Sequence, residues 1–209
     1  FPYDPSEVEF VLITHSHTDH SGRLPKLYKE GFRGKVIATD PTVDLIKKAQ
    51  PDNLNLIKKE AEEAGREPLF DLKDLAGVIS LAENVGYEEE INLGNNITAV
   101  LHDAGHILGS AIIELRWSDH PNDGQTIRIY FSGDLGNPPT PLLRVPYLPD
   151  NADFIVIEST YGSRAHEDKD ERRNILERII QETIIKGGTL MIPSFAMERT
   201  QELLYELNN

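Results

Sequence analysis

Four metal-binding side chains follow a short strand near the start of this chain, and they restrict its possible folds more than any other feature. Residues 8–14 are mostly β-branched or aromatic, which predicts a buried strand. His15 and His17 follow it directly, and a loop leaving a strand can turn both toward one point. Asp19 and His20 lie at the start of the next predicted helix, just before its cap, and can turn toward a second point nearby. This spacing predicts two divalent cations about 3.5–4 Å apart, rather than a cluster of surface histidines.

Two further candidate ligands lie at the ends of later predicted strands. His106 lies within residues 103–110, where glycines allow the backbone to approach closely and aim an imidazole inward. Asp134 lies within residues 131–136, and a single carboxylate can bridge two metal ions with its two oxygens. Either segment alone would be weak evidence for a metal ligand. A two-metal site needs more ligands than the four in the histidine loop, so the two segments together are stronger evidence. We therefore include His106 and Asp134 in the predicted metal site.

The ligand chemistry is narrowed by the absence of cysteine from all 209 residues. Disulfides, iron–sulfur clusters, zinc–thiolate sites and cysteine nucleophiles are excluded. Imidazole and carboxylate ligands suit zinc first, with manganese or iron as alternatives. A chain without cysteine also fits a reducing compartment, and we expect a cytoplasmic protein.

The rest of the chain alternates between strand and helix patterns. Strands are predicted at residues 35–38, 97–101, 111–117, 126–131, 153–157 and 189–192, with a hairpin turn at 121–124. Helices are predicted at 22–30 with Ser21 as the cap, from Asp40 as the cap to about 83 with breaks, at 167–186 and from 196 onward. Residues 57–90 carry ten acidic and four basic side chains and are interpreted as a solvated helical insertion. Together these patterns favour an α/β fold of layered sheets and helices.

The net charge and the two ends of the chain bear on whether the protein binds nucleic acid, enters a membrane or is secreted. With 21 basic and 35 acidic residues, the formal net charge is −14. This excludes attachment to nucleic acid by overall basicity but not by a small local site. No apolar run approaches about 18 residues, so we expect no membrane helix, and residues 1–5 do not resemble a signal peptide. The chain lacks an initiator methionine and stops within a helical pattern, which we interpret as an internal piece of a longer protein.

Together these motifs resemble the metallo-β-lactamase superfamily, whose signature is the His-x-His-x-Asp-His loop. The segments 103–111, 131–136, 158–162 and 187–204 resemble more closely its β-CASP branch of RNA-processing nucleases. The resemblance implies an incomplete αββα sandwich at 1–160, lacking its first strands, and the start of a β-CASP domain at 161–209. Glu198 stands where the branch usually has glycine, which changes a turn and no predicted ligand.

The resemblance also implies a role for each site residue. One metal is assigned to His15, His17 and His106, the other to Asp19 and His20, and Asp134 is shared. Glu158 matches an acidic residue that supports a catalytic histidine in the branch, so we predict Asp19 and Glu158 as catalytic residues. The histidines that complete the second metal site and act as general acid in the family would lie beyond residue 209.

The predicted function is hydrolysis of RNA, in single-stranded form, by a hydroxide held between two metal ions. Phosphate contacts are then needed despite the acidic charge, and Arg164 and Arg199 are candidates. One alternative is another hydrolase of this fold, acting on a thioester, a lactone or a small phosphodiester. Another is a catalytically incomplete fragment or structural partner. The sequence leaves open whether the protein forms an oligomer.

Overall fold

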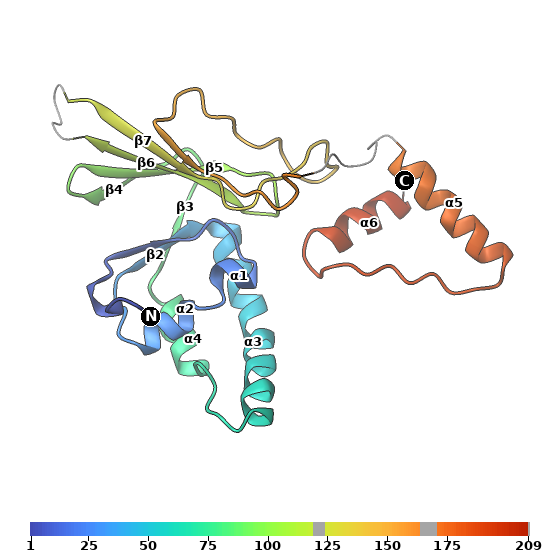
Figure 1. Ribbon diagram of the computed structural model, residues 1–209, viewed down its shortest axis with the longest axis horizontal. Helices are drawn as coiled ribbons and strands as arrows, with labels where there is room; N and C mark the ends of the chain where they lie inside the picture. The colour runs from blue at the N-terminus through green and yellow to red at the C-terminus, as the bar shows by residue number, and fades with distance from the viewer. Residues whose placement is uncertain (119–123, 164–170, 209) are drawn as a thin grey trace. The chain divides into compact units, whose positions relative to one another are not determined.

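The computed structural model describes residues 1–118, 124–163 and 171–208 (Figure 1). The chain divides into two compact units: the first comprises residues 1–139 and 143–158, and the second comprises residues 140–142 and 159–209. Residues 121–123 of the hairpin turn predicted at 121–124, together with Arg164, lie outside the described residues.

A three-stranded parallel sheet forms one layer of the first unit. Its strands run in the order β1 (Phe10–Leu12), β2 (Lys35–Thr39) and β3 (Ala82–Val85). Parallel neighbours need long crossover connections, and helices supply them here. These connections contain α1 (Thr18–Ser21), α2 (Leu24–Lys29), α3 (Asp40–Glu63) and α4 (Leu72–Ile79), and the short 3-10 helix η1 (Pro5–Glu7) precedes β1.

A five-stranded sheet forms the other layer. Its strands run in chain order: β4 (Glu90–Gly94), β5 (Ile97–Asp103), β6 (Ala111–Ser118), β7 (Thr126–Phe131) and β8 (Phe154–Val156). Pairing is antiparallel from β4 to β7, and β8 adds in parallel to β7. The carboxyl ends of β5, β7 and β8 therefore lie at one edge of this sheet, which is where the loops after these strands begin.

The two sheets face each other in the first unit, and the helices cover the other side of the smaller sheet (Figure 1). Strand β2 shows how alternation builds this arrangement, because successive side chains of a strand point to opposite faces. Ile37 packs in a cluster with Leu101 and Ile113 of the larger sheet. Val36 and Ala38 instead belong to the cluster that contains the helices. The fold is therefore mixed α/β, as the sequence pattern predicted, and its strands form two sheets.

The region from 57 to 90 differs from the helical insertion that we predicted. Helix α3 ends at Glu63, α4 spans only Leu72–Ile79, and two strands follow, β3 and β4. The prediction failed because acidic side chains concealed the strand pattern. In β3, Glu83 pairs with Lys35 on the neighbouring strand, with Nζ and Oε2 2.7 Å apart, while Val85 is buried. The segment therefore contributes to the core as well as to the surface.

Two predicted helix caps are also wrong. Ser21 lies inside α1, and its hydroxyl donates to the carbonyls of Ser16 and His17 at 2.9 and 3.0 Å. The cap of α3 is Thr39 rather than Asp40, because the hydroxyl of Thr39 accepts from the amide of Thr42. A side chain can cap only from the residue before the first helical turn.

The second unit contains α5 (Arg172–Ile185) and α6 (Arg199–Asn208). Residues 189–192, all described, form no strand, contrary to prediction. A β-branched run becomes a strand only when a neighbour pairs with its backbone, and no described residue does so here. Across the described parts of the chain, no helix is both long and apolar enough to span a membrane.

Candidate metal centre

The loop between β1 and α1 carries His15 and His17, and the fold holds it from two sides. His15 is fully buried, and His17 occupies the position before the first turn of α1. The hydroxyl of Ser21 ties the loop to α1 through the carbonyls on either side of the Ser16–His17 peptide bond. Gln50 of α3, itself buried, donates to that hydroxyl oxygen at 3.4 Å. The backbone of the loop is thus fixed independently of its imidazoles.

Four predicted ligands meet in one group. One ligand atom from each of His15, His17, His106 and Asp134 lies within 4.8 Å of all the others. Nδ1 of His17 lies 3.0 Å from Nε2 of His15 and 3.2 Å from Nε2 of His106. Oδ2 of Asp134 lies 3.5 Å from Nε2 of His106 and 3.8 Å from Nε2 of His15. Residues nearly 120 positions apart in sequence therefore converge.

The other carboxylate oxygen of Asp134 faces a second group. Oδ1 of Asp134 lies 3.4 Å from Nε2 of His20, which in turn lies 3.4 Å from Oδ2 of Asp19. His20 is partly buried, whereas the side chain of Asp19 is 76% exposed. The two oxygens of one carboxylate thus divide between two sets of donors, and the more open set contains Asp19.

These separations fit the chemistry of divalent ions. Zinc binds imidazole nitrogen at about 2.0–2.1 Å, so tetrahedral ligand atoms around one zinc lie about 3.3 Å apart. The measured separations in the two groups, 3.0–3.8 Å, bracket this value. The first group brings four donors within 4.8 Å of one another and could therefore hold a metal ion. In the second group, His20 lies near the carboxylates of both Asp134 and Asp19.

The environment of the first group disfavours protonation of His15 and His17. Burial, followed by the neighbouring His20, His106 and His17, lowers the pKa of His15 to about 2. Burial also lowers the pKa of His17, although the nearby carboxylates of Asp19 and Asp134 oppose the shift. A metal binds only unprotonated imidazole, so the environment that disfavours protonation leaves the ring lone pairs available.

Thr14 contacts the outer nitrogens of two of these rings. Its Oγ1 lies 3.2 Å from Nδ1 of His15 and 3.4 Å from Nδ1 of His20. A hydroxyl has two lone pairs, so it can accept from both rings and leave each Nε2 unprotonated toward the centre. Thr14 was not predicted from the sequence, because a threonine at the end of a strand has no chemistry that marks it as part of a metal site.

Backbone turns present His106 and Asp134. The loop carrying His106 is closed by Ser110, whose Oγ accepts from the amides of His106 at 3.0 Å and Ile107 at 3.2 Å. Asp134 follows Gly133, which has a positive φ of 54°. A Cβ on Gly133 would lie 2.7 Å from Cβ of Thr14, so only glycine permits this approach. Both turns thus bring sheet edges against the histidine loop.

Glu158 lies beside the turn that carries Asp134. Its Oε1 accepts from the amide of Leu135 at 2.7 Å, and its own amide donates to Oγ of Ser132 at 3.1 Å. The carboxylate therefore supports the residue next to a candidate ligand. Its catalytic role stays a prediction.

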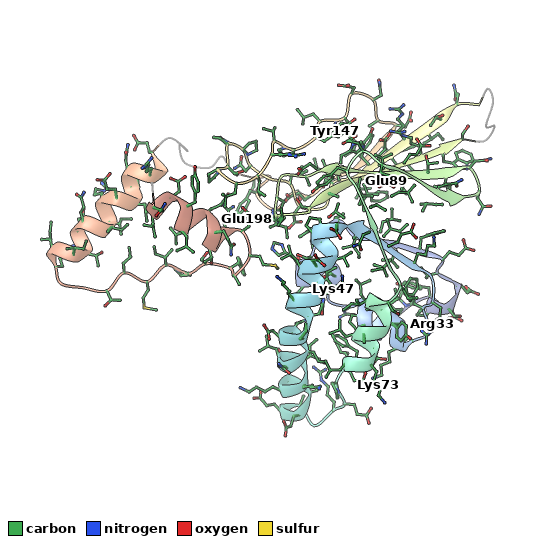
Figure 2. The ribbon with its side chains drawn as sticks, turned by 180° about the vertical axis from the view of Figure 1, so that it is seen from behind. Arg33, Lys47, Lys73, Glu89, Tyr147 and Glu198 are labelled. Atoms are coloured by element: carbon green, nitrogen blue, oxygen red, sulfur yellow. The ribbon has the colours of Figure 1, made fainter. Side chains whose placement is uncertain are left out.

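A second polar cluster lies on the face of the larger sheet that points away from the smaller sheet. The buried ring of His102 contacts the carboxylates of Glu88 at 2.8 Å and Glu114 at 2.9 Å and stacks on Tyr147 at 3.9 Å. Figure 2 labels Tyr147, which lies on the loop beside the larger sheet. Burial would raise the pKa of Glu114, but hydrogen bonds from Arg116 and His102 outweigh it and lower that pKa to about 2. This cluster holds β5 and β6 to the segment that contains Tyr147.

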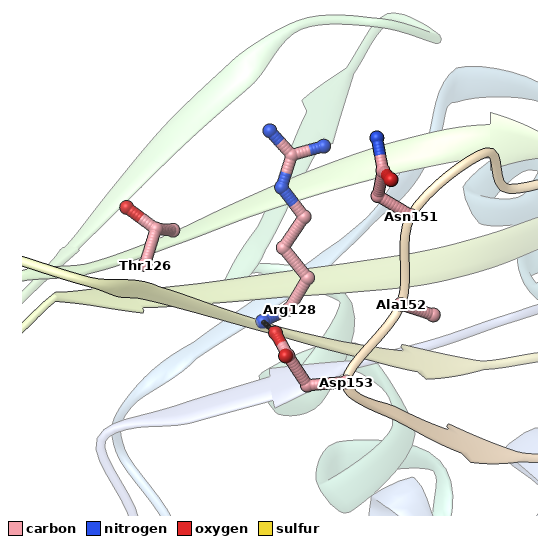
Figure 3. A pocket seen from close by; sticks show the side chains of 5 residues that line it. All are labelled: Thr126, Arg128, Asn151, Ala152 and Asp153. Carbon is pink, nitrogen blue, oxygen red and sulfur yellow. Dashed lines mark hydrogen bonds between the residues drawn. The ribbon is translucent and has the colours of Figure 1, made fainter.

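A polar hollow of about 380 Å³ lies elsewhere on the first unit (Figure 3). It is lined by Thr126, Arg128, Asn151, Ala152 and Asp153. Thr126 begins β7, whereas Asp134 follows the end of that strand, so the hollow is not part of the candidate metal centre.

Comparison with known proteins finds no matching family model but several similar proteins. The chain is 39% identical to ribonuclease TTHA0252 of Thermus thermophilus, covering 99% of this chain and 44% of the relative. It is 38% identical to transcription termination factor FttA of Methanothermobacter thermautotrophicus, covering 96% and 30%. It is 32% identical to endoribonuclease YSH1 of Eremothecium gossypii, covering 99% and 26%. The chain thus spans less than half the length of these relatives. Over nearly all of its own length, it is a homologue of proteins named as nucleases and as a termination factor.

Proposed function

We propose that this chain belongs to the β-CASP branch of the metallo-β-lactamase superfamily and forms part of a metal-dependent phosphodiesterase that cleaves RNA. The observation that carries the proposal is the convergence of His15, His17, His106 and Asp134 within 4.8 Å. Similarity to a ribonuclease and an endoribonuclease supports RNA as the substrate. In this proposal the facing sheets are the inner layers of an αββα sandwich, and residues from 161 onward begin a β-CASP domain.

The donor set favours two zinc ions, with manganese or iron as alternatives. Two divalent ions lower the pKa of water and stabilise the charge that develops on a phosphate during in-line displacement. His15, His17 and His106 would hold one ion, and His20 with Asp19 the other. Asp134, which places one oxygen near each group, would help to hold both ions.

Asp19 is our candidate for handling a proton in this reaction. Its carboxylate is the most exposed of the ligand side chains, so water can reach it. A carboxylate at that position can orient an attacking water and accept its proton, besides binding metal. Glu158 would act differently, by holding the turn after Asp134 through the amide of Leu135.

Phosphate binding must overcome the acidic charge of the chain. Arg199, one predicted contact, has Nη1 3.0 Å from Oε2 of Glu202 and so is held in an ion pair. The net charge of −14 makes long-range attraction of RNA unfavourable, which leaves phosphate recognition to local groups and to the metal ions. We therefore expect weak dependence of RNA affinity on salt compared with a basic nuclease.

The test is cleavage by the intact protein of labelled RNA, single-stranded DNA, a simple phosphodiester, a thioester and a lactone, with and without a chelator. We expect RNA cleavage that the chelator abolishes and added zinc restores. Asp134→Asn should abolish it, whereas Asp44→Asn, which alters an exposed acid on α3, should not. Cleavage of only a thioester or a lactone would overturn the proposal.

A further inference from the structure

One carbonyl in the loop that carries His106 receives two hydroxyl groups from another part of the chain. The carbonyl oxygen of Gly109 lies 2.6 Å from Oγ1 of Thr39 and 2.8 Å from Oγ1 of Thr42. Both threonines come from the junction between β2 and α3, some 67–70 residues earlier in the sequence. The loop belongs to the larger sheet and the threonines to the smaller layer, so these bonds connect the two layers.

The contact is sealed from water. Thr39 is 2% exposed and Thr42 is fully buried, and their hydroxyl oxygens lie 3.0 Å apart. A carbonyl oxygen has two lone pairs, and here both can be used. Because no water can replace either donor, removal of one hydroxyl leaves acceptor capacity unsatisfied in the interior.

Only glycine at position 109 allows the backbone to come this close to Thr39 and Thr42. Its φ is +82°, and a Cβ there would lie 2.7 Å from the amide nitrogen of Thr42 and 2.8 Å from Oγ1 of Thr39. No other residue could bring its carbonyl this close without moving the start of α3. The backbone of the loop and the threonine pair are thus fitted to each other.

The two hydrogen bonds to the carbonyl of Gly109 restrain the position of His106 through a short chain of contacts. Gly109 precedes Ser110, whose hydroxyl oxygen accepts from the amide of His106. The imidazole of His106 lies 3.2 Å from the ring of His17, which belongs to the histidine loop. Fixing Gly109 therefore fixes the loop that aims Nε2 of His106 at the other ligands.

We propose that Thr39 and Thr42 are positioning residues that hold His106 in place for metal binding. The inference rests on the proposed function, because it assigns a purpose to the geometry of the same centre. It adds a prediction that the ligand set alone does not make: metal affinity depends on two buried hydroxyls that touch no ligand.

Thr42 is the better residue for testing the positioning of His106, because Thr39 also caps a helix and Thr42 does not. Thr39 caps α3 as well as contacting Gly109, so its loss would weaken the helix in any case. Thr42 lies within the first turn, and its hydroxyl donates to the carbonyl of Gly109. Thr42→Val removes this hydroxyl with little change of shape, and Thr42→Ser restores it.

The experiment measures zinc affinity of the intact protein by competition with a chromophoric chelator. A matched control is Ser80→Ala, because Ser80 donates to the carbonyl of Gly77 at 2.7 Å in α4, away from the centre. We expect Thr42→Val to weaken zinc binding at the group that contains His106 by about tenfold, as loss of an outer contact does in other metal sites. Thr42→Ser and Ser80→Ala should bind as the wild type does.

Amide hydrogen exchange provides a second readout at a temperature where all variants are folded. Exchange at residues 106–110 should accelerate in Thr42→Val and not in Thr42→Ser. Equal zinc affinity in Thr42→Val and wild type would overturn the inference, as would failure of serine to restore it. Normal zinc binding without RNA cleavage in the wild type would overturn only the proposed function. A wild type that binds no zinc would overturn both.

Discussion

The buried imidazole of His15 makes the metal-free protein sensitive to mild acid. In the folded state the pKa of His15 is lowered to about 2, because the ring is buried and lies beside His20, His106 and His17. In the unfolded chain an imidazole binds a proton below about pH 6.5. Between these two values the unfolded state therefore holds more protons at this site, and acid favours unfolding.

The size of the effect follows from the difference in pKa. One proton of difference changes the free energy of unfolding by about 1.4 kcal/mol per pH unit. Integrated from neutral pH down to about pH 5, His15 alone removes about 2 kcal/mol of stability. The lowered pKa of His17 acts in the same direction. A loss of this size is large compared with a typical total of about 5–15 kcal/mol.

The assay is urea unfolding at several pH values between about 5 and 7, a range in which ordinary carboxylates remain ionised. A chelator is included, because bound zinc would add a separate pH dependence through competition between metal and protons. His15→Gln removes the titrating group and should flatten the slope of stability against pH. Val78→Ala lowers stability by opening a cavity in the core and should leave that slope unchanged. Equal slopes for His15→Gln and wild type would refute this account of His15.

Three other substitutions give distinct expected results. Thr14→Val should weaken zinc binding by about tenfold in equilibrium dialysis, because only the hydroxyl can accept from the rings of His15 and His20. Thr14→Ser keeps the hydroxyl and should bind zinc as the wild type does. Equal affinities for Thr14→Val and wild type would show that Thr14 does not have this role. Asp134→Asn should lower the zinc content measured by atomic emission from about two ions per chain, because the amide keeps one oxygen and no negative charge and so cannot serve both groups as the carboxylate does. Unchanged content would contradict a shared ligand. Glu158→Ala should lower the free energy of unfolding by about 1 kcal/mol in urea, because the amide of Leu135 loses its acceptor. Glu158→Gln retains an oxygen there and should unfold close to wild type.

Two features of the sequence made the candidate centre predictable: the closeness of the histidines in the loop and the position of the other ligands at the ends of strands. His15 and His17 leave one strand through a few residues, so their convergence follows from local chain geometry. Asp134 follows β7, and the residues after a strand end emerge at a sheet edge whatever the details of packing. What could be predicted was therefore the meeting of these ligand types at strand ends.

The strands β3 and β4 were not predictable by the same reasoning. Residues 83–90 combine Glu83 and three consecutive glutamates with only a few apolar positions, and the local pattern resembles a polar helix. Pairing with β2 determines the outcome, since Val85 is buried there and Glu83 meets Lys35 across the strands. Such pairing depends on residues almost 50 positions away, which a local pattern does not contain.

The same limit explains why the supporting threonines escaped notice. A ligand is recognised by its chemistry, since few side chains bind metal, but a hydroxyl is common and acquires meaning only from its neighbours. Thr42 gains its role from Gly109, and Thr14 gains its role from rings that only the fold brings together. If the threonine pair holds His106 as proposed, the smaller sheet is more than a scaffold for the histidine loop. It would also set the position of a ligand carried by the larger sheet, so that metal affinity depends on how closely the two layers pack.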